Sequence, residues 1–337
     1  MLHELQAIIQ QAILHQKAGL KSVLATVVAL DGSSYRRPGV RMLISESGVM
    51  TGAVSGGCVE KEVARRAEEV FRKGEALVMT YDGRYRLGCK GTLYLLIEPF
   101  QVSDALFRAF RRELTRRVPL KIESYFVKQD SASGTFGSII TLEGEKHPFH
   151  ASLTLEPDFL SFCQELMPKN RLLIIGAEHD AVKLTSQAAA LGWQVEVLCT
   201  LKDPKGIDDF PGAEEVSPCH PEAFTEVELD AATAVVLMTH NFSLDLAYLM
   251  ALSSKEFAYL GILGASQRRE QLFEALLERK PSLEVTFLEA IHGPAGLNLG
   301  AETPEEIALS ILAEILSVFR KKQPSSLRSL SGSIHAP

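Results

Sequence analysis

The sequence predicts an α/β protein, in which an N-terminal mixed α/β domain is followed by a Rossmann-like, doubly wound domain with a parallel sheet. Two observations predict this fold. The second half of the chain alternates short apolar strands with helical segments, as doubly wound sheets do. The first half contains several strands joined by tight, glycine-containing turns. A chain of 337 residues also exceeds one comfortable hydrophobic core, so two domains are expected.

The composition is that of a soluble globular protein, with 46% apolar and 23% charged residues. A formal net charge of −7 argues against nucleic acid as the main partner. No apolar run reaches the roughly 20 residues that a membrane span needs, and the N-terminus lacks the basic region of a signal peptide. Five scattered cysteines fit reduced thiols, so we expect a cytoplasmic protein.

In the first half, residues 2–20 have the apolar spacing of a helix that is closed by Gly19. Further elements are expected in this order: strands at 22–30, 40–45, 49–53, 75–81 and 92–98, a helix at 103–117, strands near 120–127 and 137–142, and a helix near 157–167. Residues 129–137 read as a polar exposed loop.

The expected domain boundary is Pro168-Lys169-Asn170, which separates domain 1–168 from domain 169–322 and leaves 323–337 as a flexible tail. The second half should contain a strand from Arg171 that leads through a glycine turn into a helix, strands at 194–199, 234–239 and 259–263, helices near 243–252 and 267–280, and a long glycine-rich loop at 289–302. Thr303-Pro304-Glu305-Glu306 is a capping box that opens a final helix to about residue 321.

The most informative stretch is residues 51–61, where a strand is followed by the turn Ser55-Gly56-Gly57 and a helix that starts beside Cys58. Adjacent glycines let the backbone turn sharply and approach a ligand. Free N–H groups at a helix start favour both an anion and a thiolate. Cys58 could be a small buried residue, but a second glycine-flanked cysteine, in Gly88-Cys89-Lys90-Gly91, favours a thiol held in a backbone anion nest.

Arg36 and Arg37 lie in a basic turn one strand away from this nest. Arginines at such positions are either solvated surface residues or groups that grip a phosphate with two parallel hydrogen bonds. Both interpretations stay open.

Four further polar residues, His179, Asp180, His240 and His292, follow strands of the second half. Ligands of open α/β sheets bind outside the carboxyl ends of the strands. These side chains are therefore either ordinary loop and capping residues or a cluster that converges at one sheet edge below the loop at 293–296. His220 lacks this context and reads as a loop residue.

The first turn of the Rossmann half departs from the dinucleotide pattern G-x-G-x-x-G/A, because it has Gly176, Glu178 and Ala181 at the three positions. Glu178 adds a Cβ and a negative charge where the pyrophosphate would lie, with a repulsion on the order of 4 kcal/mol at 4 Å. The acid expected at the end of the second strand is replaced by Cys199. NAD(P) binding is therefore disfavoured.

Several motifs together resemble the XdhC/CoxI family. In the N-terminal half these are Gly52-Ala-Val-Ser-Gly-Gly-Cys-Val-Glu60, the turn at 88–91 and Ile97-Glu-Pro99. In the C-terminal half they are Gly176-Ala-Glu-His-Asp-Ala181, Met238-Thr-His-Asn241, Gly261-Ile-Leu-Gly264 and the stretch from Ile291 to Glu306. The similarity covers nearly the whole chain in the right order.

This resemblance implies an accessory factor, rather than a turnover enzyme, that binds molybdenum cofactor (molybdopterin) and helps to deliver it in sulfurated form to a xanthine dehydrogenase-type hydroxylase. It also implies a homodimer that meets a cysteine desulfurase and the apo-enzyme in turn. The matching positions make Cys58 and Cys89, with their flanking glycines, the candidate contacts to the cofactor and its molybdenum. The family commonly has glycine where this chain has Lys90, which adds a positive charge that an anionic ligand would tolerate.

The residues themselves fit this ligand, because molybdopterin offers a phosphate, a metal-oxo centre and a dithiolene, which call for N–H donors, cations and soft thiolates. Two other functions stay open. One is a nicotinamide-dependent oxidoreductase that uses the Rossmann half. The other is a sulfur carrier with a persulfide on Cys58.

Overall fold

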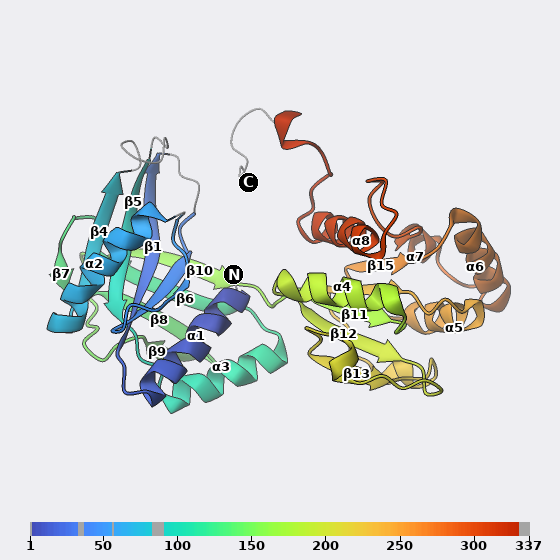
Figure 1. Ribbon diagram of the computed structural model, residues 1–337, viewed down its shortest axis with the longest axis horizontal. Coiled ribbons are helices and arrows are strands. Elements are labelled where there is room, and N and C mark those ends of the chain that lie inside the picture. The colour runs from blue at the N-terminus through green and yellow to red at the C-terminus, as the bar shows by residue number, and fades with distance from the viewer. Residues whose placement is uncertain (1, 33–36, 56, 83–90, 330–337) are drawn as a thin grey trace. The chain divides into compact units, whose positions relative to one another are not determined.

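The computed structural model divides into two compact units, Met1–Pro168 and Lys169–Pro337 (Figure 1). It describes residues 2–32, 37–55, 57–82 and 91–329. The predicted fold class is confirmed, because the N-terminal unit contains antiparallel sheets with helices and the C-terminal unit contains a parallel sheet. Within those residues, no helix is long and apolar enough to cross a lipid bilayer.

In the described part of the N-terminal unit, a six-stranded sheet of order β3-β2-β1-β5-β4-β7 faces a four-stranded sheet of order β10-β6-β8-β9. Its elements are α1 (Leu2–Lys17), β1 (Ser22–Gly32), β2 (Arg41–Ser45), β3 (Met50–Gly52), α2 (Cys58–Lys73), β4 (Ala76–Asp82), β5 (Gly91–Pro99), α3 (Asp104–Arg116), β6 (Leu120–Phe126), β7 (Ser133–Gly134), β8 (Gly137–Leu142), β9 (Glu145–Pro148) and β10 (Leu160–Leu166).

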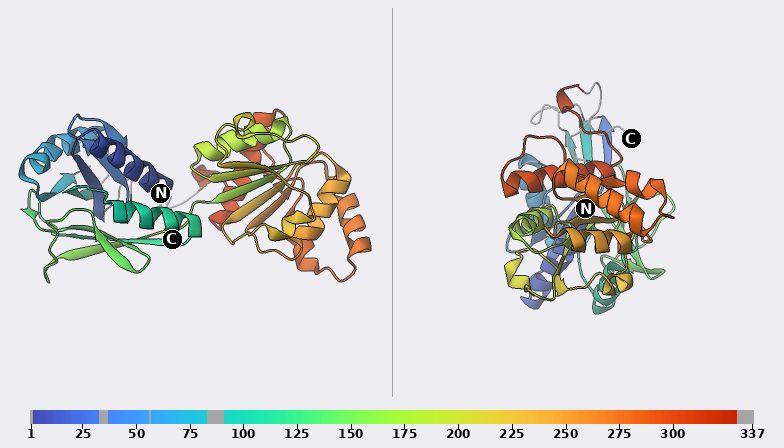
Figure 2. Two further views of the ribbon diagram at one scale, coloured as in Figure 1. Left: turned by 90° about the horizontal axis from the view of Figure 1, so that it is seen from below. Right: turned by 90° about the vertical axis from the view of Figure 1, so that its right-hand side faces the viewer.

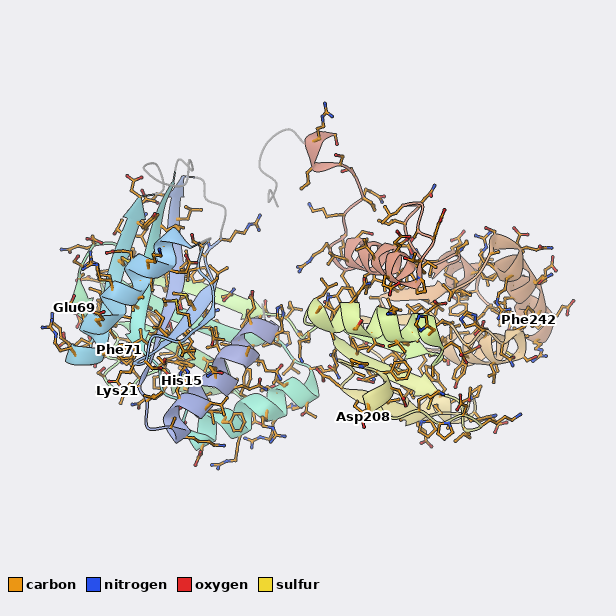
Figure 3. All side chains as sticks on the ribbon, in the orientation of Figure 1. His15, Lys21, Glu69, Phe71, Asp208 and Phe242 are labelled. Carbon is orange, nitrogen blue, oxygen red and sulfur yellow. The ribbon has the colours of Figure 1, made fainter. Side chains whose placement is uncertain are left out.

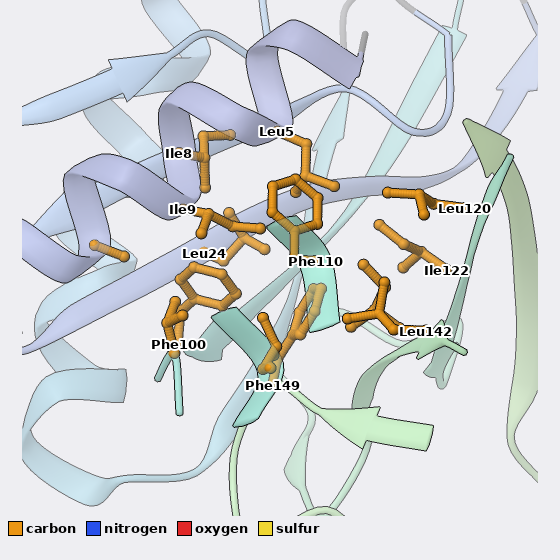
Figure 4. Packing of buried hydrophobic residues seen from close by; sticks show 14 of the residues in the cluster. Leu5, Ile8, Ile9, Leu24, Phe100, Phe110, Leu120, Ile122, Leu142 and Phe149 are labelled. Atoms are coloured by element: carbon orange, nitrogen blue, oxygen red, sulfur yellow. The ribbon is translucent and has the colours of Figure 1, made fainter. Parts of the chain in front are cut away.

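The alternation of side chains along β1 explains how these layers pack. Val23, Ala25 and Val27 are buried in one cluster with the apolar face of α2, because successive side chains of a strand point to opposite faces. Leu24 lies on the other face, in a cluster that α1, α3 and the second sheet complete (Figure 4). The large sheet is thus buried on both sides, with α2 on its outer face.

The predicted helix near residues 157–167 is wrong, because this segment is the edge strand β10. It pairs with β6 without interruption from Leu160↔Phe126 to Leu166↔Leu120. Gln164 and Leu166 are buried while their neighbours are exposed, which is the two-residue period of a strand. The segment predicted as a polar loop at 129–137 also contains β7 and the buried Phe136.

The C-terminal unit is a doubly wound sheet of order β13-β12-β11-β14-β15-β16, in which all neighbouring strands described are parallel (Figure 2). Its elements are β11 (Arg171–Ile175), α4 (His179–Ala190), β12 (Gln194–Cys199), η2 (Ile207–Asp209), β13 (Glu215–Pro218), η3 (Ala223–Glu226), β14 (Thr233–Leu237), α5 (Phe242–Leu252), β15 (Tyr259–Ile262), α6 (Ser266–Arg279), α7 (Val285–Glu289), β16 (Ile291–His292), α8 (Pro304–Phe319) and η4 (Leu327–Ser329).

Helices cover both faces of this sheet. One buried cluster joins alternate strand residues, such as Leu172 and Ile174, to α4 and α8. The residues between them, Leu173 and Ile175, belong to a second cluster with α5 and α6. The edge strands β13 and β16 are not predicted from the sequence, because each is short and mixes polar with apolar residues. The predicted tail at 323–337 lies partly outside the described residues.

Candidate functional site

Helix α2 begins at Cys58, as the glycine turn predicted. The residue before it, Gly57, has a φ of +119°, a conformation that side chains other than glycine rarely adopt. A Cβ built on Gly57 would meet no atom within 4 Å, so backbone conformation, and not crowding, explains the glycine. Val59, Val63 and Ala67 then bury one face of α2 against the large sheet, which fixes the start of the helix at the sheet edge.

The amide groups of this turn are occupied by the protein itself. Glu60 reaches back so that its Oε1 accepts from Ser55 N at 2.6 Å and its Oε2 accepts from Gly57 N at 2.7 Å. The expectation that these two N–H groups are free is therefore wrong, because the third residue of the helix caps them. The same geometry demonstrates that the turn binds an anionic oxygen, as a helix start should.

Other predicted contacts of this site lie outside the described residues, namely Arg36, Gly56, Gly88, Cys89 and Lys90. Cys58 is described by its backbone, and Arg37 is exposed. Joint binding of a cofactor or of molybdenum by Cys58 and Cys89 therefore stays a prediction. Within the described ranges, no group of three His, Cys, Asp or Glu residues is arranged to hold a metal ion.

A second candidate site lies at the carboxyl edge of the parallel sheet, between β11 and β14. The chain turns from β11 to β12 on one side and continues at β14 on the other, which makes this the topological switch point. Gly176 has a φ of +129°, and a Cβ there would lie 2.3 Å from the carbonyl oxygen of Met238. Glycine is thus required because the two strand ends pass so closely, independent of any ligand.

His240 and Asp180 meet across this switch point, with Nε2 of the histidine 3.6 Å from Oδ2 of the aspartate. His240 has a φ of +54°, in the left-handed region that few non-glycine residues adopt. Backbone strain of this kind is often found at functional sites. His179 is exposed in the first turn of α4, and Glu178 is the exposed N-cap residue without a capping hydrogen bond.

His292 has a different surrounding from His240. Its Nδ1 lies 3.2 Å from Oε1 of Glu314 on α8, and its ring stacks on Tyr259 with 4.4 Å between the ring centroids. Glu314 also accepts from the Tyr259 hydroxyl and from Gly296 N. The structure therefore brings Asp180 and His240 together, and the contacts described for His292 tie it to α8.

Cys199 occupies the end of β12, where a dinucleotide site would have its ribose-binding acid. The side chain is buried, and its Sγ accepts from Lys205 N at 3.4 Å. The thiol accepts a hydrogen bond from the loop that follows β12. A thiol cannot replace a carboxylate as the acceptor for two ribose hydroxyls.

The sequence does not predict two clusters of buried polar residues, one around Asp245 and one around Glu98. In the first, Asp245, 1% exposed, accepts from Thr239 Oγ1 at 2.6 Å and from Arg268 Nη2 at 2.7 Å beside the switch point. Nothing in the pattern distinguishes Asp245 from a surface residue of α5, because its two partners are distant or lie in a loop.

The second such group surrounds Glu98, which is completely buried between the two sheets of the N-terminal unit. Its carboxylate accepts from Ser138 N at 2.7 Å and from Ser138 Oγ at 2.6 Å, and His150 Nε2 lies 3.6 Å away. Burial raises the pKa of Glu98 to about 7, although the Ser138 hydrogen bonds and the Arg41 charge lower it. The sequence does contain a signal for this cluster, because Glu98 is an acidic residue at the end of the apolar strand predicted at Thr92–Glu98.

Comparisons with known proteins identify the family to which these two units belong. Residues 172–315 match the XdhC Rossmann domain, and residues 15–82 match the XdhC and CoxI family. The chain belongs to the XdhC/CoxI family. The predicted resemblance is therefore confirmed for both halves of the chain.

Relatives in this family match over nearly the full length. A Bacillus subtilis (strain 168) protein, named as a probable xanthine dehydrogenase subunit, is 29% identical over 89% of this chain and 94% of its own length. The Escherichia coli (strain K12) "Molybdenum cofactor insertion chaperone PaoD" is 27% identical over 93% of this chain and 88% of its own length. A crystal structure described as a xanthine dehydrogenase from Bacillus halodurans has a TM-score of 0.75 at 28% identity, and covers 95% of this chain and 98% of its own.

Proposed function

We propose that this protein binds molybdenum cofactor and inserts it into a xanthine dehydrogenase-type molybdenum hydroxylase. The observation that carries the proposal is the similarity, over 93% of this chain, to a protein named a molybdenum cofactor insertion chaperone. Two other relatives carry the name xanthine dehydrogenase. A carrier that meets the hydroxylase during maturation accounts for both kinds of name.

The turn at the start of α2 fits the chemistry of this cargo. Its amides at Ser55 and Gly57 hold the carboxylate of Glu60, which stands in for an anionic oxygen such as that of a phosphate or an oxo group. In the proposed complex the cargo takes these donors in place of Glu60, and the Cys58 thiolate, at the positive end of the helix dipole, binds the soft metal.

The rest of the proposed site comes from the sequence. Cys89 and Lys90 would add a second thiolate and a cation, and Arg36 and Arg37 would neutralise the phosphate. We further propose that the protein works as a cytoplasmic homodimer, and that it receives sulfur through a cysteine desulfurase before it meets the apo-enzyme.

Anaerobic co-purification tests the proposal. The protein is isolated from cells that make the cofactor, and bound pterin and molybdenum are measured by fluorescence of the oxidised pterin and by metal analysis. Cys58→Ala should lose most of both, whereas Cys163→Ala, which changes an exposed cysteine on β10, should keep them. Equal loading of the two variants contradicts the assigned site. A persulfide trapped on Cys58 without pterin favours a sulfur carrier instead.

A further inference from the structure

Arg41, the first residue of β2, is a buried cation in the N-terminal unit. Charged side chains such as those of Lys21 and Glu69 reach solvent at the surface of this unit (Figure 3). Arg41 is only 7% exposed, and it shares the face of β2 on which Leu43 packs towards the second sheet. Burial lowers the pKa of its guanidinium to about 10, so Arg41 stays charged at neutral pH.

Two acceptors hold one nitrogen of the Arg41 guanidinium. Nη1 donates to the carbonyl oxygen of Gly39 at 2.9 Å and to Oε1 of Gln164, a buried residue of the edge strand β10. The N–H of Gly39 in turn donates to the carbonyl oxygen of Val27 on β1 at 2.8 Å. Gly39 is thereby hydrogen-bonded through both its N–H and its C=O.

The side chain of Gln164 also packs directly against Gly39. A Cβ on Gly39 would lie 2.2 Å from Nε2 of Gln164, and Gly39 has a φ of +100°, so only glycine fits at this position. One residue, Pro38, separates Gly39 from the exposed Arg37. Because a proline ring fixes φ, the position of Gly39 restricts where the Arg37 guanidinium can reach.

Stability alone does not explain a guanidinium at position 41. Among the residues that the structure describes, Nε and Nη2 of Arg41 have no hydrogen-bond partner. Burying a cation with incomplete partners costs stability, and apolar residues of similar size are often as stable in such places or more so. Support of the turn that presents Arg37 gives the buried charge a purpose.

We propose that Arg41 and Gln164 are positioning residues, which hold Gly39 so that the Arg37 guanidinium meets a phosphate group with two parallel hydrogen bonds. The inference rests on the proposed function, because the phosphate is that of the molybdopterin cargo. Arg41 itself is buried and does not touch the phosphate. A turn that is fixed before binding loses less conformational entropy when its ligand arrives. Disturbing the support should therefore weaken phosphate binding although Arg37 is still present.

An NMR titration with glycerol 3-phosphate tests this inference without the cofactor. The Nε–Hε signal of Arg37, identified by its loss in Arg37→Lys, should shift with glycerol 3-phosphate and stay in place with glycerol. In the double variant of Arg41→Met and Gln164→Leu, the dissociation constant should rise about three- to tenfold. The control Arg112→Met removes an exposed arginine of α3 in the same unit, and it should bind as the unmodified protein does.

Thermal unfolding separates positioning from a purely structural role. The double variant removes a buried donor and its acceptor together, so its unfolding midpoint should not fall, whereas its binding should weaken. Gly39→Ala disturbs the same turn and leaves both arginines in place, so it should weaken binding as well.

Three results would overturn the inference. One is an Arg37 signal that does not respond to glycerol 3-phosphate in the unmodified protein. Another is unchanged binding by the double variant. The third is a large fall of its midpoint together with unchanged binding by Gly39→Ala, which would mean that Arg41 serves the fold. Phosphate binding that depends on Arg41, in a protein that carries no molybdopterin after co-purification, would contradict the proposed function and support the positioning role.

Discussion

Nε2 of His240 lies 3.6 Å from Oδ2 of Asp180, and this contact joins the loop that follows β14 to the first turn of α4, which follows β11. In doubly wound sheets these segments border the crevice where ligands bind. Both side chains are partly exposed, so the pair contributes little to stability. Its significance is that two residues 60 positions apart meet where the order of the described strands reverses, between β11 and β14.

Nucleotide binding at this crevice should depend on Glu178. We expect the unmodified protein not to bind NAD or NADP measurably, because Glu178 is the N-cap residue of α4 and puts a negative charge where a pyrophosphate would lie. Glu178→Gly should admit the phosphates, with weak binding since Cys199 leaves the ribose without an acid. Calorimetry on both proteins measures this. Tight binding of a dinucleotide by the unmodified protein would favour the oxidoreductase function.

Glu60→Gln should lower the stability of the protein but increase its loading with molybdenum cofactor. The substitution removes the charge that caps Ser55 N and Gly57 N, so the free energy of unfolding should fall by about 0.5–2 kcal/mol. Because the amide competes less well for these donors, loading with molybdenum cofactor should rise. Urea unfolding and pterin fluorescence measure the two effects. A loss of both would mean that Glu60 supports the cargo rather than competing with it.

Glu98 should make the stability of the N-terminal unit pH-dependent. Its pKa is raised to about 7 in the folded state from the ordinary 4.5. The folded protein therefore binds the proton more tightly, and stability should rise as the pH falls from 7 to 4.5 and be lowest above 7. The amplitude is on the order of 3 kcal/mol. Unfolding of Glu98→Gln at pH 5 and pH 7.5 should lack this component. An unchanged pH dependence would contradict the assignment.

Gly137→Ala should disturb the contact between Glu98 and His150. A Cβ at this position would lie 2.3 Å from His150 Nε2 and 2.8 Å from Glu98 Oε2, so the buried side chains must move. We expect a loss of about 1–3 kcal/mol in the free energy of unfolding. Gly206→Ala is the control, because the nearest atom to its Cβ is 3.9 Å away. Thermal unfolding compares the two, and similar midpoints would show that the packing adapts.

The apolar runs of the second half, such as Arg171–Ile175, predicted the doubly wound sheet correctly, because strands buried on both faces need no polar alternation. The strand β10 was predicted as a helix, since its edge position is determined by pairing with β6 and not by its own residues. Glycine conformation likewise predicted the start of α2 at Cys58. The Glu98–His150 and His292–Glu314 contacts join residues far apart in the chain, and no local pattern encodes such distances.

The carboxylate of Glu60 has a consequence for the transfer of cargo. A carrier has to give up what it holds, and a binding turn left with empty amides would resist unloading. Glu60 is tethered three residues from Gly57, so its local concentration at the turn is high. Under the proposed function, arrival and departure of the cofactor would then be an exchange of one anion for another at the amides of Ser55 and Gly57. Such an exchange keeps the affinity moderate and the hand-over reversible.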